Sequence, residues 1–321
     1  MNNSVVITGA TGFIGKYLLL NFLSKGYFVC AVVRSEERKT ELVKFLGRNN
    51  AGLSNITVLI SALDDISADK FGEASYDAWF HLAWDGVNKD GVNDPLIQGK
   101  NVIFSKQCLK CAKDLNCSLF ADFGSRAECS GDVKIVEETM TKVSLSAYGA
   151  KKKEFYEIAK DYCEEHDMRY VHFRIFAAFG PGDHPWSLIM TACRNFLNNA
   201  SMQFGACTQS WNYLDVRDIA ALVVLVYERV KKSANSDTTG EIINIASKES
   251  RPLKEFVMEV YDICSSSSQL SFGENAGFSS VPSLNGIKKY GIDYQEIPFK
   301  DTIRDIIRAR EFSVQHREVL P

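Results

Sequence analysis

The chain has 321 residues, of which 45% are hydrophobic and 24% are charged. A chain of this size and composition buries a large core and forms one large or two modest domains. Its formal net charge of −3 supplies no basic field for nucleic acid or an anionic membrane. No apolar stretch approaches the roughly 20 residues that a membrane span needs.

The start of the chain and its cysteines favour the cytoplasm. The first residues, MNNSVVITGATG, run straight into a strand pattern and lack the basic region and long apolar segment of a signal peptide. The nine cysteines are dispersed, which is typical of reduced thiols. Cys108 and Cys111 have CxxC spacing, but they fall in a helical pattern with no second pair or histidine cluster, so we predict no metal site.

Short apolar runs alternate with stretches of helical spacing through the first 176 residues. Strands are expected over residues 5–8, 27–33, 56–60, 76–84, 118–124 and 169–176. Helices are expected over residues 13–23, 36–46, 95–115 and 145–166. This alternation predicts crossover connections and a parallel sheet that is covered on both faces.

The segment TGATGFIG joins the first strand to the first helix. Its glycines, Gly9, Gly12 and Gly15, have GxxGxxG spacing rather than GxGxxG. Gly9 allows a tight turn, Gly12 lets the backbone approach a pyrophosphate, and Gly15 lets the helix pack close to its strand. The helix N-terminus adds free N–H groups and positive partial charge, so this context predicts dinucleotide binding rather than a simple turn. The other cofactor contacts expected in this loop are Thr11, Phe13 and Ile14.

After residue 177 the regular alternation stops. The segment 179–185, rich in glycine and proline, is expected to be a loop. It is followed by a helix over 186–199, a strand near 211–215, a helix over 216–231, a strand over 240–246 and mixed elements to the end. We therefore predict an α/β fold with a Rossmann-type doubly wound parallel sheet and a smaller C-terminal α/β substrate lobe. The dinucleotide-binding domain would comprise residues 1–177 and about 207–247, and the substrate-binding lobe about 178–206 and 248–321.

Three polar residues form a candidate catalytic set. Tyr148 and Lys152, in YGAKK, are four apart and therefore share one face of a helix. A tyrosine near its ordinary pKa of ~10 is a poor acid–base at neutral pH, and a cation one turn away lowers that pKa. Ser125, in FGSRAEC, follows the 118–124 strand and is expected beside the cofactor. The set predicts proton exchange with a substrate oxygen.

Together these segments resemble the extended short-chain dehydrogenase/reductase family, the NAD(P)-dependent sugar-nucleotide epimerase/dehydratase group. The likeness runs over about two-thirds of the chain in family order. It is carried by TGATGFIG, HLAW (81–84), KNV (100–102), Ser125, YGAKK, FRIFAAFGPGD (173–183) and WNYLDVRDIA (211–220).

The resemblance implies a role for each matching residue. Tyr148 would be the catalytic acid–base, Lys152 would bind the nicotinamide ribose, and Ser125 would hydrogen-bond the reacting oxygen. Leu82 and Ala83 would line the cofactor groove. The same resemblance puts Leu63 against the adenine, Asn101 in the supporting helix and His81 in a structural role within the fourth strand.

Several positions depart from the family pattern. Arg126 and Ala127 replace the Asp–Glu pair that a dehydratase uses to remove water, which disfavours that reaction. Cys129 replaces a tyrosine that usually packs, and Ala62 replaces the aspartate that reaches the adenine amine. Trp211 replaces an arginine that some epimerases place on the substrate diphosphate. The alternative diphosphate ligands are Arg194 and Arg217, unless these are surface or ion-paired residues.

The tip of the second strand reads AVVRSEER, with Val33 and then Arg34 where NAD-binding proteins place an acid. An acid there hydrogen-bonds the ribose 2′-OH of NAD, whereas a guanidinium binds a 2′-phosphate. Ser35 and Arg38 would add further donors. We therefore expect NADP(H), with NAD(H) as the alternative if Arg34 merely stacks on adenine.

The preferred interpretation is an NADPH-dependent reductase of a nucleotide-activated keto-sugar, a 4-keto-6-deoxyhexose, in cell-surface polysaccharide precursor synthesis. The substrate contacts expected are Ser125, Arg126, Phe176, Asp183 and Ser187. The alternatives are an NAD-retaining sugar-nucleotide epimerase, a reductase of small non-nucleotide carbonyls and a non-enzymatic cofactor sensor.

The resemblance also implies a homodimer formed by the 95–115 and 145–166 helices. Leu109, Phe155 and Tyr156 are expected either at that interface or against the sheet.

Overall fold

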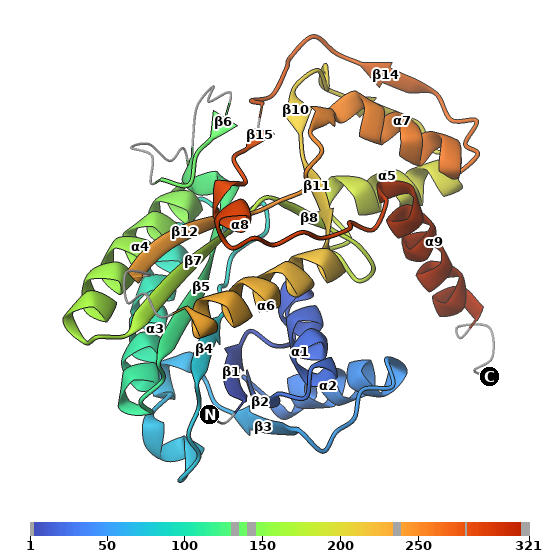
Figure 1. Cartoon of the computed structure of the whole chain (residues 1–321). Coiled ribbons are helices and arrows are strands. Elements are labelled where there is room, and N and C mark those ends of the chain that lie inside the picture. Colours follow the sequence, from blue (N-terminus) through green and yellow to red (C-terminus); the bar gives the residue numbers. More distant parts are fainter. Residues whose placement is uncertain (1–2, 130–134, 140–145, 234–238, 280, 316–321) are drawn as a thin grey trace.

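The computed structural model describes residues 3–129, 135–139, 146–233, 239–279 and 281–315, with side chains to residue 309. Its centre is a seven-stranded parallel sheet in the order β12-β7-β5-β4-β1-β2-β3 (Figure 1). This order, with β1 between β2 and β4, confirms the predicted Rossmann-type doubly wound fold. The strands are β1 (Ser4–Thr8), β2 (Phe28–Val33), β3 (Ile56–Ile60), β4 (Ala78–His81), β5 (Leu119–Ser125), β7 (Arg169–Ile175) and β12 (Thr239–Ile245).

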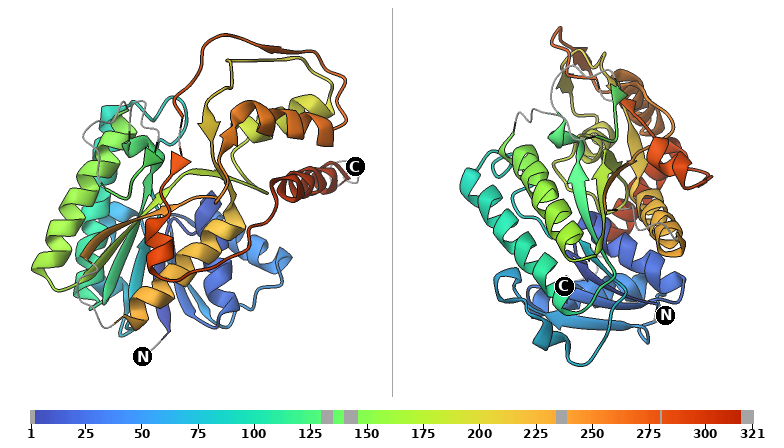
Figure 2. Two further views of the ribbon diagram at one scale, coloured as in Figure 1. Left: turned by 45° about the horizontal axis from the view of Figure 1, so that its top comes forward. Right: turned by 60° about the vertical axis from the view of Figure 1, so that its left-hand side comes forward.

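Helices cover both faces of this sheet, as the right-hand view of Figure 2 shows. One face packs against α1 (Phe13–Ser24), α2 (Glu36–Arg48) and α6 (Val216–Lys232). The other packs against α3 (Pro95–Asp114) and α4 (Ala147–Glu165). Most core positions of the strands are apolar on both faces, as a sheet buried on both sides requires.

Helix caps set several boundaries that periodicity alone misplaces. The Ser146 side chain accepts from the Gly149 N–H and starts α4, so the helix begins at Ala147; the expected start at residue 145 lies outside the described residues. Ser187 caps α5 (Leu188–Leu197) in the same way, so that helix begins two residues later than predicted. The fourth strand is shorter than the predicted 76–84 because only Ala78–His81 pair within the sheet.

A second group of elements lies at the upper right of Figure 1, beyond the carboxyl ends of the strands. Its helices are α5, α7 (Leu253–Ile263) and α9 (Phe299–Gln315), and their core includes Phe196, Val257 and Ile303. Short strand pairs surround it: β8 (Ala177–Phe179) with β11 (Tyr213–Asp215), β9 (Met202–Phe204) with β14 (Leu270–Phe272), and β10 (Ser210–Trp211) with β13 (Arg251–Pro252). The strand β8 was not predicted, and its last residue, Phe179, lies in a segment expected to be loop.

The remaining short elements are β6 (Ile135–Val136), β15 (Val281–Pro282), α8 (Asn285–Lys289) and three 3₁₀ turns. These turns are η1 (Leu63–Asp65), η2 (Ala68–Phe71) and η3 (Arg126–Glu128).

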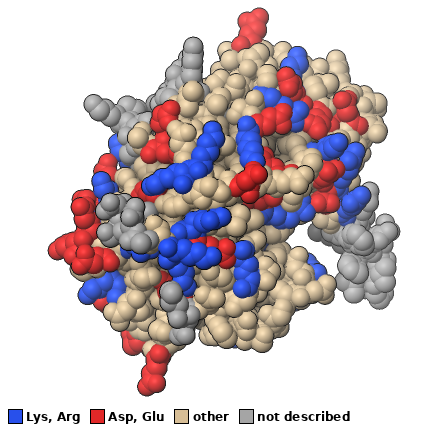
Figure 3. Space-filling view, viewed as in Figure 1, with Lys and Arg blue, Asp and Glu red and all other residues tan. Residues whose placement is uncertain are grey.

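Acidic and basic side chains lie side by side across the face seen in Figure 3. Within the described part of the chain, no helix is both long and apolar enough to span a bilayer. All nine cysteines are free thiols.

Candidate active site

The glycine loop packs directly onto the end of β4. Gly9 has a φ of +74°, and a Cβ there would lie 2.7 Å from the Ala83 nitrogen. A Cβ on Gly15 would lie 2.1 Å from the Gly9 carbonyl oxygen, so α1 can approach the loop only with glycine at this position. Gly12 caps α1 and is exposed, with its N–H donating to the Gly9 carbonyl at 2.9 Å. The loop therefore leaves an open helix N-terminus, which fits a dinucleotide pyrophosphate.

The base of this loop is held by a buried histidine. His81 Nδ1 lies 2.8 Å from Thr8 Oγ1, and His81 Nε2 lies 2.8 Å from Ser105 Oγ. Burial, with a contribution from Lys152, lowers the pKa of His81 to about 3, so the ring is neutral. His81 therefore joins β1, β4 and α3 in a structural role.

Ser125, Tyr148 and Lys152 come together at the carboxyl end of β5. Ser125 is the last residue of that strand, and its hydroxyl hydrogen-bonds to the Tyr148 phenol. Lys152 is buried, donates to the Phe123 carbonyl at 2.6 Å, and has Nζ 3.8 Å from the centroid of the Trp84 ring. The structure thus assembles the predicted trio from β5 and one face of α4.

The pKa values of this trio differ from the expectation. Burial raises the pKa of Tyr148 to about 12; Glu128 adds to the rise, and the hydrogen bond from Ser125 opposes it. The predicted depression of the Tyr148 pKa by Lys152 is therefore wrong for this structure, because desolvation outweighs it. Burial also lowers the pKa of Lys152 to about 8, against the pull of Asp122 and Glu128.

Helix α3 fixes the segment that follows β4. Asn101 donates from Nδ2 to the Asp85 carbonyl at 2.9 Å, and its Oδ1 accepts from the Asp85 N–H at 2.9 Å. Gln98 accepts from the Trp84 indole at 2.7 Å. Asn101 thus has the predicted supporting position, and Gln98 sets the indole against Lys152.

Arg34 lies just beyond β2 at the mouth of the predicted cofactor groove. Its side chain is 62% exposed, and Nη1 lies 3.6 Å from an Asp85 oxygen. Ser35 caps α2, and Arg38 donates to Glu41 at 2.8 Å, so both of these proposed phosphate ligands already have partners. The other groove residues predicted, Leu63 and Leu82, are partly buried against the two sheet cores.

The predicted substrate contacts lie in η3 and in the segment from β7 to the start of α5. Arg126 donates to the Ser279 carbonyl at 3.3 Å, which joins the end of β5 to that group. Phe176 follows β7, and its N–H donates to the Ile245 carbonyl at 3.2 Å. Asp183 accepts from the His184 N–H at 2.6 Å, and burial raises its pKa. Ser187 caps α5, so loop structure accounts for its hydroxyl.

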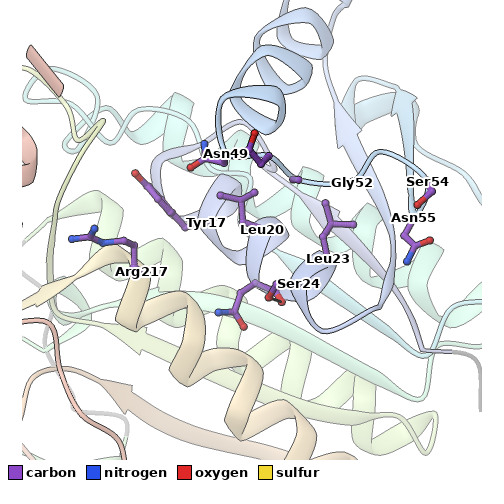
Figure 4. Close-up of a pocket in the computed structure, with 12 residues that line it drawn as sticks. Tyr17, Leu20, Leu23, Ser24, Asn49, Gly52, Ser54, Asn55 and Arg217 are labelled. Atoms are coloured by element: carbon purple, nitrogen blue, oxygen red, sulfur yellow. Dashed lines mark hydrogen bonds between the residues drawn. The ribbon is translucent and has the colours of Figure 1, made fainter. Parts of the chain in front are cut away.

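The two arginines considered for the diphosphate are engaged elsewhere. Arg217 donates to Asp215 at 2.6 Å and to Asp305 at 2.8 Å. It also lines a pocket of about 420 Å³ with Tyr17 and Leu20 of α1 (Figure 4). Arg194 donates to the Pro185 carbonyl at 3.2 Å. Arg217 is therefore an ion-paired structural residue.

Sequence reasoning missed a set of buried charges beneath Ser125: Asp122, Glu128, His172 and Arg174. One signal was available, because Ser125 and Glu128 have the S-x-x-E spacing of a capping box, which the structure contains. Asp122 in β5 and His172 and Arg174 in β7 alternate with apolar residues. That pattern does not reveal on which face of the sheet each charged side chain meets a group of opposite charge.

No group of three or more His, Cys, Asp or Glu side chains suited to a metal ion occurs among the residues described.

The model of the NAD dependent epimerase/dehydratase family matches residues 5–246. The chain belongs to this family. The predicted resemblance and the predicted class of NAD(P)-dependent oxidoreductase or epimerase are confirmed.

Several known proteins are similar to this chain over most of their length. An uncharacterised oxidoreductase of Schizosaccharomyces pombe is 28% identical over 311 residues, covering 85% of this chain and 91% of that protein. CDP-abequose synthase of Salmonella muenchen is 23% identical over 282 residues, covering 85% of each chain. The structure of UDP-glucuronic acid 4-epimerase from Bacillus cereus in complex with NAD aligns with a TM-score of 0.79, at 19% identity, over 95% of this chain and 96% of that one.

Proposed function

We propose that this chain is an NADPH-dependent reductase of a nucleoside-diphosphate keto-sugar, a 4-keto-6-deoxyhexose, in the synthesis of cell-surface polysaccharide precursors. The observation that carries the proposal is the meeting of Ser125, Tyr148 and Lys152 at the end of β5, with Arg126 and Ala127 in place of a dehydratase acid pair. The similarity to a CDP-abequose synthase supports the sugar-nucleotide substrate class.

The protonation state of Tyr148 favours the reductive direction. With a pKa raised to about 12, the phenol keeps its proton throughout the neutral range and starts as a proton donor. Ser125 would hydrogen-bond the carbonyl oxygen and hold it against the phenol. Lys152 would replace the proton that Tyr148 gives up, since burial places its pKa near 8. Bound NADPH would supply the hydride that reaches the carbonyl carbon.

The charge at the tip of β2 supports NADP. The residues there are Val33 and Arg34, so the end of β2 itself supplies no carboxylate, although that of Asp85 lies 3.6 Å from Arg34. The guanidinium of Arg34 is exposed, and its contact with Asp85 is a surface pair that a phosphate can replace.

The second candidate is an epimerase that retains NAD. It is favoured by the similarity in fold to the UDP-glucuronic acid 4-epimerase solved with NAD. An enzyme of this kind would return the hydride to the sugar and would need no added NADPH.

The deciding experiment combines binding with turnover. Thermal shift with NADP and NAD, and with the diphosphates of uridine, cytidine, thymidine and guanosine, should show the largest shift for NADP plus one nucleoside diphosphate. Stoichiometric oxidation of NADPH should then follow addition of the matching 4-keto-6-deoxy sugar, and Tyr148→Phe should abolish it. Interconversion of two sugar epimers without net NADPH oxidation would instead establish the epimerase.

The remaining alternatives give distinct outcomes in the same experiment. Reduction of small carbonyls with no nucleoside diphosphate binding would indicate a non-nucleotide substrate. Cofactor binding without turnover of any carbonyl would indicate a sensor.

We also propose a homodimer formed by the outer face of α3 and α4. Leu96 and Ile103 are 76% and 61% exposed, and a groove of about 500 Å³ nearby is lined by Ile103, Ile158 and Tyr162. Leu109, Phe155 and Tyr156 face the sheet core instead.

Two further assignments remain proposals. The core containing Phe196, Val257 and Ile303 would belong to the substrate-binding lobe, with boundaries as predicted from sequence. The nine free thiols favour a cytoplasmic protein.

A further inference from the structure

A cluster of buried charges lies directly beneath the catalytic serine. The side chains of Glu128, His172 and Arg174 are 0% exposed and that of Asp122 is 1% exposed. Burying two carboxylates and two cations costs free energy that apolar residues of similar size would not cost. Stability alone therefore does not account for the cluster, which suggests a role in the adjacent reaction.

The sheet register assembles this cluster. In the parallel pairing of β5 with β7, Asp122 lies opposite His172 and Gly124 lies opposite Arg174. A Cβ on Gly124 would lie 2.1 Å from His172 Nε2 and 2.4 Å from Glu128 Oε1. The glycine before Ser125 therefore provides the space into which Glu128 turns back from η3.

The imidazole of His172 is held between the two carboxylates. Its Nδ1 lies 2.7 Å from Asp122 Oδ1, and its Nε2 lies 3.0 Å from Glu128 Oε2. Because both ring nitrogens face carboxylate oxygens, the ring donates twice and is an imidazolium. Burial alone would lower the pKa of His172, but Asp122 and Glu128 outweigh it and raise the pKa to about 9.

The second oxygen of Glu128 reaches the catalytic residue. Glu128 Oε1 accepts from the Ser125 N–H at 2.6 Å, while Ser125 Oγ accepts from the Ala127 N–H at 3.2 Å. Arg174 Nε donates to the Glu128 oxygen that faces His172, at 3.2 Å, so this carboxylate has a partner on every side. The backbone of Ser125 is thereby fixed against β7 through a charged group.

We propose that Glu128, anchored by the His172 imidazolium, is a positioning residue that fixes Ser125, and through the Ser125 hydroxyl the Tyr148 phenol, toward the reacting carbonyl. That the reacting group is a carbonyl rests on the proposed reductase, whereas the contacts of Ser125 do not depend on it. The negative charge of Glu128 also raises the pKa of Tyr148, which keeps the phenol protonated.

The test compares Glu128→Gln with Asp215→Asn. The glutamine keeps the size of the side chain and an oxygen for the Ser125 N–H but removes the charge. Asp215 is a matched control, because it is a buried carboxylate that binds Arg217 and Thr302 in another part of the fold. Loss of a buried carboxylate is expected to destabilise both variants.

The first readouts need no substrate. ¹⁵N NMR of the wild type should show His172 doubly protonated at about pH 8, above the ordinary histidine pKa of ~6.5. Glu128→Gln should lower the pKa of His172, because Asp122 is then the one carboxylate among the described residues that contacts the ring. Titration of ¹³Cζ-labelled tyrosine, with the Tyr148 signal assigned by its loss in Tyr148→Phe, should give a lower Tyr148 pKa in Glu128→Gln and an unchanged one in Asp215→Asn.

The kinetic readout uses the substrate identified for the proposed function. Glu128→Gln should lower kcat by about ten- to a hundredfold with the KM for NADPH unchanged, as misplacement of an active-site group does. The high-pH limb of the kcat profile should move to lower pH, and Glu128→Asp should restore part of the rate.

Three results would overturn the proposal. They are a neutral His172 in the wild type at about pH 8, a Tyr148 titration that Glu128→Gln leaves unchanged, and a kcat loss no larger than that of Asp215→Asn. If Glu128→Gln does not fold, the His172 state in the wild type and the Glu128→Asp kinetics still decide. If no keto-sugar is reduced but the two titrations behave as expected, the proposed function fails and the positioning role stands.

Discussion

Reversing the charge of Arg34 tests whether the tip of β2 selects the cofactor. Arg34 and Asp85 are 62% and 72% exposed with 3.6 Å between their charged atoms, so their pair contributes about 0–1 kcal/mol. A 2′-phosphate can therefore draw the guanidinium away from Asp85 at little cost. We take Arg34→Asp as the perturbation because it removes the cation and adds a repulsive carboxylate.

The expected effect follows from the bond that is lost. A charge-assisted hydrogen bond contributes about 1.5–3 kcal/mol, which corresponds to roughly 10- to 150-fold in the dissociation constant of NADPH. Repulsion from the new carboxylate adds to this loss, so we expect about a hundredfold weaker binding of NADPH. NADH has no 2′-phosphate, and its affinity should stay the same or improve.

The assay is calorimetric titration of each variant with NADPH and NADH. Arg48→Asp is the matched control, because it makes the same charge change at the other end of α2. Asp85→Asn should act in the opposite direction, tightening NADPH by up to about fivefold, since it releases Arg34 and removes a negative charge from the groove.

An unchanged ratio of NADPH to NADH affinity in Arg34→Asp would refute the reasoning. Equal losses for both cofactors would show that Arg34 stacks on adenine without reading the phosphate. Either result would make the NAD-retaining epimerase the preferred functional hypothesis.

Four further outcomes are expected. Gly15→Ala should destabilise the fold by about 1–3 kcal/mol and weaken NADPH binding, because its Cβ would meet the Gly9 carbonyl at 2.1 Å. In urea unfolding, Gly47→Ala should be neutral or stabilising by up to ~1 kcal/mol, since a Cβ there meets nothing within 4 Å. His172 has a pKa raised from 6.5 to about 9, so its stabilising contribution should be complete below pH 6.5 and lost as the pH rises through 9. His172→Gln should flatten that part of the unfolding profile, and a profile identical to the wild type would exclude a charged ring. Ile103→Glu should yield monomers in light scattering, while monomeric wild type would reject the proposed dimer face.

Much of the sheet and the glycine loop was predictable from local patterns. The strands β1 to β3 and the helix α1 have apolar spacing that needs no distant partner to be recognised. Tyr148 and Lys152 were placed together because four residues make about one helical turn. These features depend on residues that are close together in the chain, and such residues can be compared directly in the sequence.

The strands β8, β9 and β14 were missed because each is three residues long. The strand β11 lies within the predicted 211–215 strand, but its pairing with β8 joins segments that are far apart in the chain. The protonation state of Tyr148 and the ion pair of Arg34 also could not be predicted from the sequence. The Tyr148 pKa depends on burial and on Glu128, and the contact of Arg34 with Asp85 joins the ends of two separate strands.

The sequence by itself determined the Rossmann-type α/β class, and it predicted the glycine loop as a nucleotide site and Ser125, Tyr148 and Lys152 as a catalytic trio, since periodicity and spacing act within a few residues. The tertiary structure decided the protonation states of the side chains in the site and the contacts that fix their positions. The register of β5 against β7 places His172 between Asp122 and Glu128, and Gly124 leaves room for that contact. Register and burial are long-range quantities, because they depend on segments that meet only when the sheet has formed.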